Sequence, residues 1–183
     1  MQLKHLTIVI PVKNEETNLG HCLDNIGDFA KVVVVDSRST DRTVEIAQKF
    51  NAAVLQFDWN GQFPKKKNWT LSSGIIKTQW VLFLDADEYL TESFKVELSK
   101  ILPETQCNGF WLTYDNFFLG RRLRHGVPFR KLFLLRNGSG AFQRVDENYW
   151  TTLDMEVHEQ LEIKGEVGTI RSPIIHNNYK GLS

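Results

Sequence analysis

The chain has 183 residues, of which 42% are hydrophobic and 24% are charged, as expected for one soluble globular domain with a substantial core. Its 22 basic and 22 acidic residues give a formal net charge of zero, so overall charge does not point to nucleic acid. Cys22 and Cys107 make no disulfide framework, and neither a signal peptide nor a transmembrane helix is expected, so the expected location is the cytoplasm.

The first hundred residues are predicted to alternate between strands and helices. Apolar, β-branched runs predict strands at residues 6–12, 31–35, 53–57 and 80–84. Apolar residues at helical spacing and local capping signals predict helices at residues 19–29, 41–50, 64–76 and 91–102. This alternation predicts right-handed βαβ units in a doubly wound α/β sheet.

The pattern changes after Pro103. Strands are predicted at 109–118, 129–135, 161–163 and 173–176, and a glycine- and arginine-rich segment lies at 120–126. We therefore expect a single domain over residues 1–183, with a front half of about residues 1–103 and a mixed back half of about residues 104–183.

The most informative segment is the end of the fourth predicted strand. The apolar run from Trp80 to Leu84 is followed at once by Asp85, Asp87 and Glu88. In extended backbone, Asp85 and Asp87 leave the same face, and carboxylates just past a strand can share Mg²⁺ or Mn²⁺. The alternative is a solvated acidic turn in front of the next helix.

Two further polar clusters follow the first two strands. They are Pro11-Val-Lys-Asn-Glu15 and Asp36-Ser-Arg-Ser-Thr-Asp41. If the strand order is 3-2-1-4, both clusters lie beside the acidic one, at the sheet edge where α/β proteins bind ligands. Asp36 is expected to accept hydrogen bonds from a ribose or a base, while the alternative is helix capping by Ser39, Thr40 and Asp41.

The phosphate-binding motifs that are missing narrow the choice of ligand. Neither Gly-x-Gly-x-x-Gly nor a Walker-type Gly-Lys-Ser/Thr is present, which argues against dinucleotide cofactors and P-loop chemistry. A nucleotide whose diphosphate is neutralised by a metal ion fits what remains. Lys67 is a candidate for contact with that diphosphate, with Asn68 near it, and a solvated helix start is the alternative for Lys67. Lys65 and Lys66 are expected to form such a solvated helix start.

Four motifs together resemble a known family. Pro11-Val-Lys-Asn-Glu15, Val35-Asp-Ser-Arg-Ser-Thr-Asp41, Lys67-Asn-Trp69 and Leu84-Asp-Ala-Asp-Glu88 resemble family 2 glycosyltransferases of the GT-A fold. Phe118-Leu-Gly-Arg121, Arg130-Lys-Leu-Phe133 and Val157-His-Glu159 are similar to the subgroup of bacterial lipopolysaccharide-core glucosyltransferases. Arg38 departs from the glycine that is usual there. The chain also ends at Ser183, where subgroup members usually continue, so a membrane-contacting tail is left open.

The resemblance implies a Rossmann-like mixed sheet and an inverting, metal-dependent transfer of a hexose from a UDP-sugar to a saccharide or glycolipid acceptor such as lipopolysaccharide core. It implies Mn²⁺ or Mg²⁺, with Asp87 as principal ligand and Asp85 shared with ribose or metal-bound water. The residues expected to line the donor nucleotide site are Pro11, Val12, Lys13, Asn14, Glu15, Asp36, Ser37, Lys67, Asp85 and Ala86.

The back half offers candidates for the remaining roles. Glu159 is the expected general base, with a surface position as the alternative and with Asp146, Glu147, Asp154 and Glu156 as competitors. His158 and His176 are candidate metal contacts, although a lone histidine is more often packed or solvated. The residues expected on the acceptor side, where arginines suit anionic groups, are Arg121, Arg124, His125 and Arg130.

Two other classes compete with a glycosyltransferase. Sugar nucleotidylyltransferases share metal carboxylates on a similar nucleotide-binding half, but they usually have a glycine-rich loop after the first strand, which residues 11–15 lack. A non-catalytic nucleotide-sugar-binding module is the other alternative. The expected partners are a UDP-sugar and a saccharide or glycolipid acceptor, with peripheral contact at the inner face of the cytoplasmic membrane left open and no nucleic acid.

Overall fold

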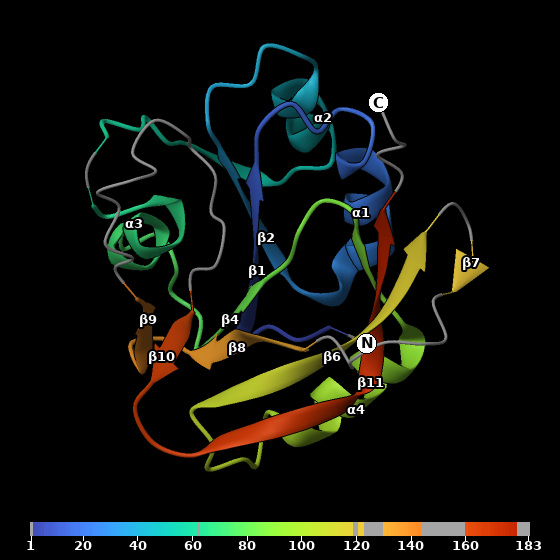
Figure 1. Cartoon of the computed structure of the whole chain (residues 1–183), viewed down its shortest axis with the longest axis vertical. Coiled ribbons are helices and arrows are strands. Elements are labelled where there is room, and N and C mark those ends of the chain that lie inside the picture. The colour runs from blue at the N-terminus through green and yellow to red at the C-terminus, as the bar shows by residue number, and fades with distance from the viewer. Residues whose placement is uncertain (1, 62, 119–120, 123–129, 144–159, 179–183) are drawn as a thin grey trace.

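The computed structural model describes residues 2–61, 63–118, 121–122, 130–143 and 160–178. A nine-stranded mixed sheet has the order β3-β2-β1-β4-β8-β6-β11-β5, with β7 paired to β6 (Figure 1). Its strands are β1 (Leu6–Val12), β2 (Lys31–Asp36), β3 (Ala53–Gln56), β4 (Trp80–Phe83), β5 (Glu88–Leu90), β6 (Gly109–Phe118), β7 (Arg121–Arg122), β8 (Arg130–Arg136) and β11 (Val167–Asn178). A separate two-stranded sheet contains β9 (Gly140–Phe142) and β10 (Leu161–Ile163).

Helices cover both faces of the sheet. They are α1 (Leu19–Ile26), the 3₁₀ turn η1 (Gly27–Phe29), α2 (Thr43–Lys49), α3 (Lys66–Ser72) and α4 (Glu92–Ile101). One buried cluster joins α1, α2 and α4 to alternate residues of the central strands, such as Ile8 and Ile10. A second cluster contains Val9 of the same strand and lies against α3, β9 and β10. Because successive strand residues point to opposite faces, the continuous apolar run of β1 fills both clusters.

The strand order of the front half is β3-β2-β1-β4, the order on which the expected convergence of the polar clusters depended. β1 pairs in parallel with β2 and β4, and β2 pairs in parallel with β3. The carboxyl ends of β1, β2 and β4 therefore meet at one edge of the sheet, between the two helical layers.

The back half continues the same sheet. β8 lies antiparallel between β4 and β6, and β11 runs parallel to β6 and antiparallel to β5. The β6–β11 register shifts between Ile170 and Pro173, and Glu97 of α4 accepts the amides of Arg171 (3.0 Å) and Ser172 (2.7 Å) at this irregularity. Helix α4 thus supplies acceptors for amides where the ladder is disrupted.

Several predicted bounds were wrong. The helix expected over 64–76 is limited to α3, and the strand expected at 173–176 begins at Val167 and reaches Asn178. Neither β5 nor β9 was predicted; β5 begins with the charged Glu88, and β9 begins with a glycine and an alanine, which are not typical of strands. Strand β5 is specified by its pairing with β11, which is a tertiary contact and leaves little trace in local sequence.

Candidate functional site

The loops that follow β1 and β2 are tied together by hydrogen bonds. The backbone amide of Asn14 donates to Ser39 Oγ (2.8 Å), and Asn14 Oδ1 accepts the amide of Thr40 (2.8 Å). Asn14 has φ of 55°, a left-handed conformation that asparagine adopts more readily than most residues. The Asn14 side chain, predicted to contact the donor, therefore also fixes the shape of the neighbouring loop.

Asp36 ends β2 and is almost fully buried, with 1% of its surface exposed. Its Oδ1 accepts the Ser39 hydroxyl (2.5 Å), and its Oδ2 accepts the Ser39 amide (3.1 Å). The neighbouring Ser37 hydroxyl is also buried, and it has no hydrogen-bond partner among the described residues. A buried hydroxyl without a protein partner at a strand end is suited to a bound ligand.

Arg38 stands where the resemblance leads one to expect glycine, and its backbone adopts a conformation that glycine favours. Its φ is 56°, in the left-handed region where glycine is favoured, so the backbone conformation is kept despite the side chain. The guanidinium forms a bidentate pair with Asp58, at 2.5 Å from Nε and 2.7 Å from Nη2. Since Asp58 follows β3, this exposed pair links the loops after β2 and β3.

The acidic segment after β4 forms a tight turn into β5, and Glu88 is fully buried at its base. The amide of Glu88 donates to the Asp85 carbonyl (3.0 Å), and the amide of Asp85 donates to Glu88 Oε2 (3.1 Å). Glu88 is thus a structural part of the turn. Describing this segment as a solvated acidic turn is wrong for Glu88, whose burial demands a compensating charge.

Lys131 supplies that charge, and the sequence analysis assigned it no role. Its Nζ lies 2.5 Å from Asp85 Oδ2 and 2.6 Å from Glu88 Oε1. The antiparallel register pairs Leu82 with Leu134, and continuing it brings Asp85, three residues after Leu82, opposite Lys131, three residues before Leu134. This juxtaposition depends on a strand pairing across 46 positions, which local pattern does not specify.

The pKa values of these groups reflect their mutual contact. Burial would raise the pKa of Asp85, but the nearby charge and hydrogen bond of Lys131 outweigh burial and hold it below its usual value. Burial, reinforced by Asp85, raises the pKa of Glu88 to about 8, although Lys131 opposes this shift. Burial would lower the pKa of Lys131, but Glu88 and Asp85 together keep it above its ordinary range.

Asp87 is directed to a different partner, His176 of β11. Asp87 Oδ2 and His176 Nε2 lie 3.4 Å apart, and each side chain is about one quarter exposed (26% and 27%). His176 Nδ1 lies 3.1 Å from Asn116 Oδ1, so the tautomer that donates this bond leaves Nε2 as the acceptor. When the ring is protonated, Nε2 carries a hydrogen and donates to Asp87 instead; this hydrogen bond, helped by the charge of Asp87, raises the pKa of His176.

This pair fits a divalent cation. Two ligand atoms at right angles on an octahedral ion, each about 2.1 Å from it, are about 3 Å apart, close to the observed Asp87–His176 spacing. A metal-binding histidine characteristically donates its other ring N–H to an oxygen, as His176 does to Asn116. Among the described residues, no three His, Cys, Asp or Glu side chains are arranged to hold a metal ion together, so water or substrate oxygens would complete the coordination.

The basic start of α3 is buried, contrary to prediction for one of its lysines. Lys66 is 6% exposed and its Nζ lies 3.4 Å from the Val12 carbonyl, so a solvated position for Lys66 is wrong. Lys67 is 4% exposed, its Nζ lies 5.0 Å from the centroid of the Phe133 ring, and its charge lowers the pKa of Asp85. Asn68 bonds both the amide and the carbonyl of Phe142, at 2.9 and 2.8 Å, and so anchors β9.

The other predicted site residues lie in the front half, in the back half or outside the described residues. Val12 and Ala86 are buried at the strand ends, Pro11 and Glu15 are partly exposed, and Lys13 is exposed. Arg130 is exposed at the start of β8, while Arg121 lies in β7, opposite Phe118 of β6. The predicted base Glu159 and the candidates His158, Arg124 and His125 lie outside the described residues, as do Asp146, Glu147, Asp154 and Glu156.

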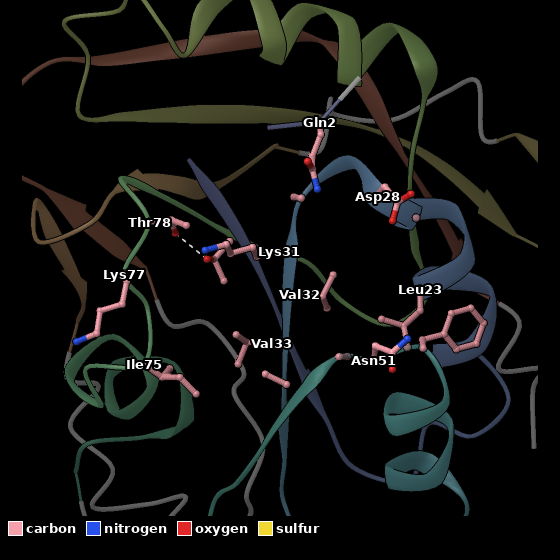
Figure 2. A pocket seen from close by; sticks show the side chains of 16 residues that line it. Gln2, Leu23, Asp28, Lys31, Val32, Val33, Asn51, Ile75, Lys77 and Thr78 are labelled. Carbon is pink, nitrogen blue, oxygen red and sulfur yellow. Dashed lines mark hydrogen bonds between the residues drawn. The ribbon is translucent and has the colours of Figure 1, made fainter. Parts of the chain in front are cut away.

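A separate hollow of about 590 Å³ lies at the opposite end of the front strands. Figure 2 shows Lys31 and Val33 of β2 in the middle of its lining, with Thr78 and Lys77 on one side and Asn51 on the other. These residues belong to the amino-terminal ends of the strands or to the connections leading into them, so this hollow is distinct from the carboxyl-end site.

In the part of the chain that is described, no helix has the length and apolar character needed to cross a membrane.

Comparison with known proteins shows what the chain is similar to. The family model described as glycosyl transferase family 2 matches residues 7–158. An uncharacterized glycosyltransferase of Rickettsia typhi is 32% identical over 191 residues, which cover 99% of this chain and 62% of that protein. The lipopolysaccharide core biosynthesis glycosyltransferase LpsC of Rhizobium meliloti is 27% identical over 175 residues, which cover 91% of this chain and 60% of LpsC.

A solved structure is similar as well. The crystal structure of S. aureus TarS superposes with a TM-score of 0.55 and 28% identity, covering 69% of this chain and 23% of that one. The chain spans about three fifths of the length of the curated relatives it matches over its full extent.

Proposed function

Because the chain belongs to glycosyl transferase family 2, we propose that it transfers a hexose from a UDP-sugar to a saccharide or glycolipid acceptor, with inversion at the anomeric carbon. Its doubly wound mixed sheet is the GT-A fold that the sequence motifs predicted. The observation that carries the proposal is the convergence of three parallel strand ends on Asp36, Ser37, Asp87 and His176.

The uridine side of the donor is assigned to the loops after β1 and β2. Asp36 retains lone pairs for a ribose or base donor while Ser39 holds it in place, and the buried Ser37 hydroxyl supplies a further polar group. Asn14 keeps the two loops in register. The site therefore presents preformed acceptors, which reduces the ordering cost of binding.

The diphosphate side is assigned to the turn after β4. Asp87 and His176 are the residues that would hold Mn²⁺ or Mg²⁺, and the bound ion would neutralise the diphosphate as it departs. The charge of Lys67 acts on Asp85 and so adds to the positive charge that Lys131 brings to this turn. Together these groups stabilise the negative charge that develops on the leaving diphosphate in the transition state more than they stabilise the intact donor.

The transfer step needs a base on the acceptor side. An acceptor hydroxyl oxygen attacks the anomeric carbon, the bond from that carbon to the diphosphate oxygen breaks, and a carboxylate takes the hydroxyl proton. We assign this role to Glu159, with Asp146, Glu147, Asp154 and Glu156 as the competitors to be tested beside it. Arg121, Arg124, His125 and Arg130 are proposed to contact anionic groups on the acceptor.

The relatives support a saccharide acceptor. LpsC carries the name of a lipopolysaccharide core biosynthesis glycosyltransferase, so a lipopolysaccharide core oligosaccharide is the first acceptor to test. UDP release from UDP-glucose is measured with MnCl₂ or MgCl₂, with and without the oligosaccharide. Acceptor-dependent release of UDP is expected.

Three outcomes would contradict the proposal. Pyrophosphate exchange would indicate a nucleotidylyltransferase, and UDP-glucose binding without turnover on any of several core acceptors would indicate a binding module. A transfer rate in EDTA equal to that in MnCl₂ would show that transfer requires no divalent metal ion. Within a transferring enzyme, Glu159→Gln is expected to bind donor normally and lose transfer by about 10²-fold or more, whereas parent-rate transfer would eliminate Glu159.

A further inference from the structure

Lys131 occupies the position between two of the three carboxylates in the turn after β4. Its side chain is 16% exposed, and its Nζ lies within 2.6 Å of one oxygen of Asp85 and one of Glu88. The same Nζ lies 5.1 Å from the centroid of the Tyr114 ring and 5.2 Å from that of Phe133. Two carboxyl groups and two aromatic rings fix the ammonium in one place.

Without this lysine, the oxygens of Asp85 and Glu88 that converge on its ammonium would attract a hard cation to the same place. Asp85, Asp87 and Glu88 lie within four positions, and clustered carboxylates bind divalent cations through oxygen. Lys131 engages two of them, whereas Asp87 faces His176. What remains for a metal ion is one carboxylate and one imidazole, a set that binds Mg²⁺ or Mn²⁺ weakly unless phosphate oxygens are added.

We propose that Lys131 is an internal counter-ion that prevents a metal ion from binding alone and so makes metal binding depend on the donor diphosphate. This inference deepens the proposed function and rests on it for the identity of the diphosphate. The ammonium repels a bare divalent cation, but in a complex with the donor the two negative charges of the diphosphate offset those of the ion, and the diphosphate adds oxygen ligands. The same positive charge therefore disfavours the metal alone and tolerates the complex.

The proposal also gives a reason for the choice of residue. A buried Glu88 paired only with apolar groups would be costly, so a cation is needed at that place whether or not a metal is present. Lysine provides that cation permanently, as part of the chain. Lys131 thus holds the turn in its binding shape before the donor binds. A turn ordered only by a bound metal ion would lack this shape until the ion arrived.

The test measures binding of Mn²⁺ to the full chain without nucleotide, by the electron paramagnetic resonance signal of unbound Mn²⁺. Lys131→Met removes the charge, and Lys131→Arg keeps it. Lys95→Met is the matched control, because Lys95 is also 16% exposed and pairs with Glu92 at 3.0 Å, on α4. We expect Lys131→Met to bind Mn²⁺ at least about tenfold more tightly than the wild type, with Lys131→Arg and Lys95→Met within about twofold of it.

A second variant guards against a folding defect. Lys131→Met with Glu88→Gln leaves no buried carboxylate without its cation but still releases Asp85, so it is also expected to bind Mn²⁺ more tightly than Glu88→Gln alone. Mn²⁺ affinity that does not rise in either Lys131→Met background would overturn the proposal. Loss of the folded state in both backgrounds, judged by circular dichroism, would overturn it as well, because it would make Lys131 a folding requirement.

A parallel titration with UDP separates this inference from the proposed function. Adding UDP is expected to tighten Mn²⁺ binding by at least about tenfold in the wild type and by a smaller factor in Lys131→Met. A wild type that binds Mn²⁺ equally well with and without UDP would contradict the dependence on diphosphate. A chain with no affinity for UDP at all would defeat the proposed function, while tighter Mn²⁺ binding by Lys131→Met would still establish that the lysine excludes the metal ion.

Discussion

If Asp87 and His176 share one cation, removing either should weaken metal-supported nucleotide binding without unfolding the protein. Their 3.4 Å contact is about one quarter exposed, and pairs of this kind contribute about 0–1 kcal/mol to stability. Asp87→Asn and His176→Ala should therefore change the free energy of unfolding by less than about 1.5 kcal/mol, allowing for the lost packing of the imidazole.

The effect on binding should be larger. Even the groups that orient metal ligands are worth about 10–100-fold in metal affinity, so loss of a ligand should cost at least that, or about 1.4–2.8 kcal/mol. Because the two residues act on one ion, the double variant should lose less than the sum of the single losses. Calorimetric titration of UDP in saturating MnCl₂, repeated in EDTA, measures both quantities.

Glu92→Gln is the control, since Glu92 pairs with Lys95 on α4 with a side chain that is 85% exposed. It should leave UDP affinity in MnCl₂ unchanged. Equal losses with and without metal in the Asp87 and His176 variants would refute the reasoning, as would strictly additive losses or a His176→Ala variant of wild-type affinity.

Three further predictions concern contacts that position the site. Asn68→Ala leaves the buried amide and carbonyl of Phe142 without their partners and should lower the free energy of unfolding by about 2–4 kcal/mol in urea denaturation; a loss below 0.5 kcal/mol would mean that Asn68 does not anchor β9. Thr91→Ala removes the hydroxyl that caps α4 by accepting the Phe94 amide (3.1 Å) and that donates to the Pro173 carbonyl (2.7 Å), and should cost about 1–2 kcal/mol, whereas Thr91→Ser should cost less than half of that. Glu97→Gln should cost about 1 kcal/mol at pH 7. Burial opposes the shift, but hydrogen bonds from Ser172 and Arg171 lower the pKa of Glu97, so its stabilisation is complete above its ordinary pKa and is lost as pH falls through the lowered value. The stability gap between wild type and Glu97→Gln should therefore narrow between pH 6 and pH 3, and a gap that widens on acidification would contradict this sign.

The sequence predicted the front half of the fold well because its signals are local. The apolar runs of β1, β2 and β4 are buried on both faces, and their alternation with helices implied the doubly wound sheet that is observed. The same logic placed Asp36, Asp85 and Asp87 at one edge of the sheet. It also identified His176 as a candidate metal contact, beside His158, without the means to bring it next to Asp87.

What the sequence did not reveal depends on pairings between distant segments. Lys131 reaches Asp85 because β8 lies antiparallel to β4, and Glu88 is buried because β5 joins the edge of β11. Lys66 looked like a solvated residue at a helix start, but the helix packs against the end of β1 and covers it. In each case the charge of the residue favours exposure to solvent, but a partner that the fold brings close makes burial favourable.

The most direct test of the account is a crystal structure of the chain with UDP and MnCl₂. We expect Mn²⁺ to be bound by Asp87 Oδ2, His176 Nε2 and diphosphate oxygens, with the uridine against Asp36 and Ser37 and with Lys131 still between Asp85 and Glu88. A nucleotide seated away from the ends of β1, β2 and β4, or a cation held without Asp87, would contradict it.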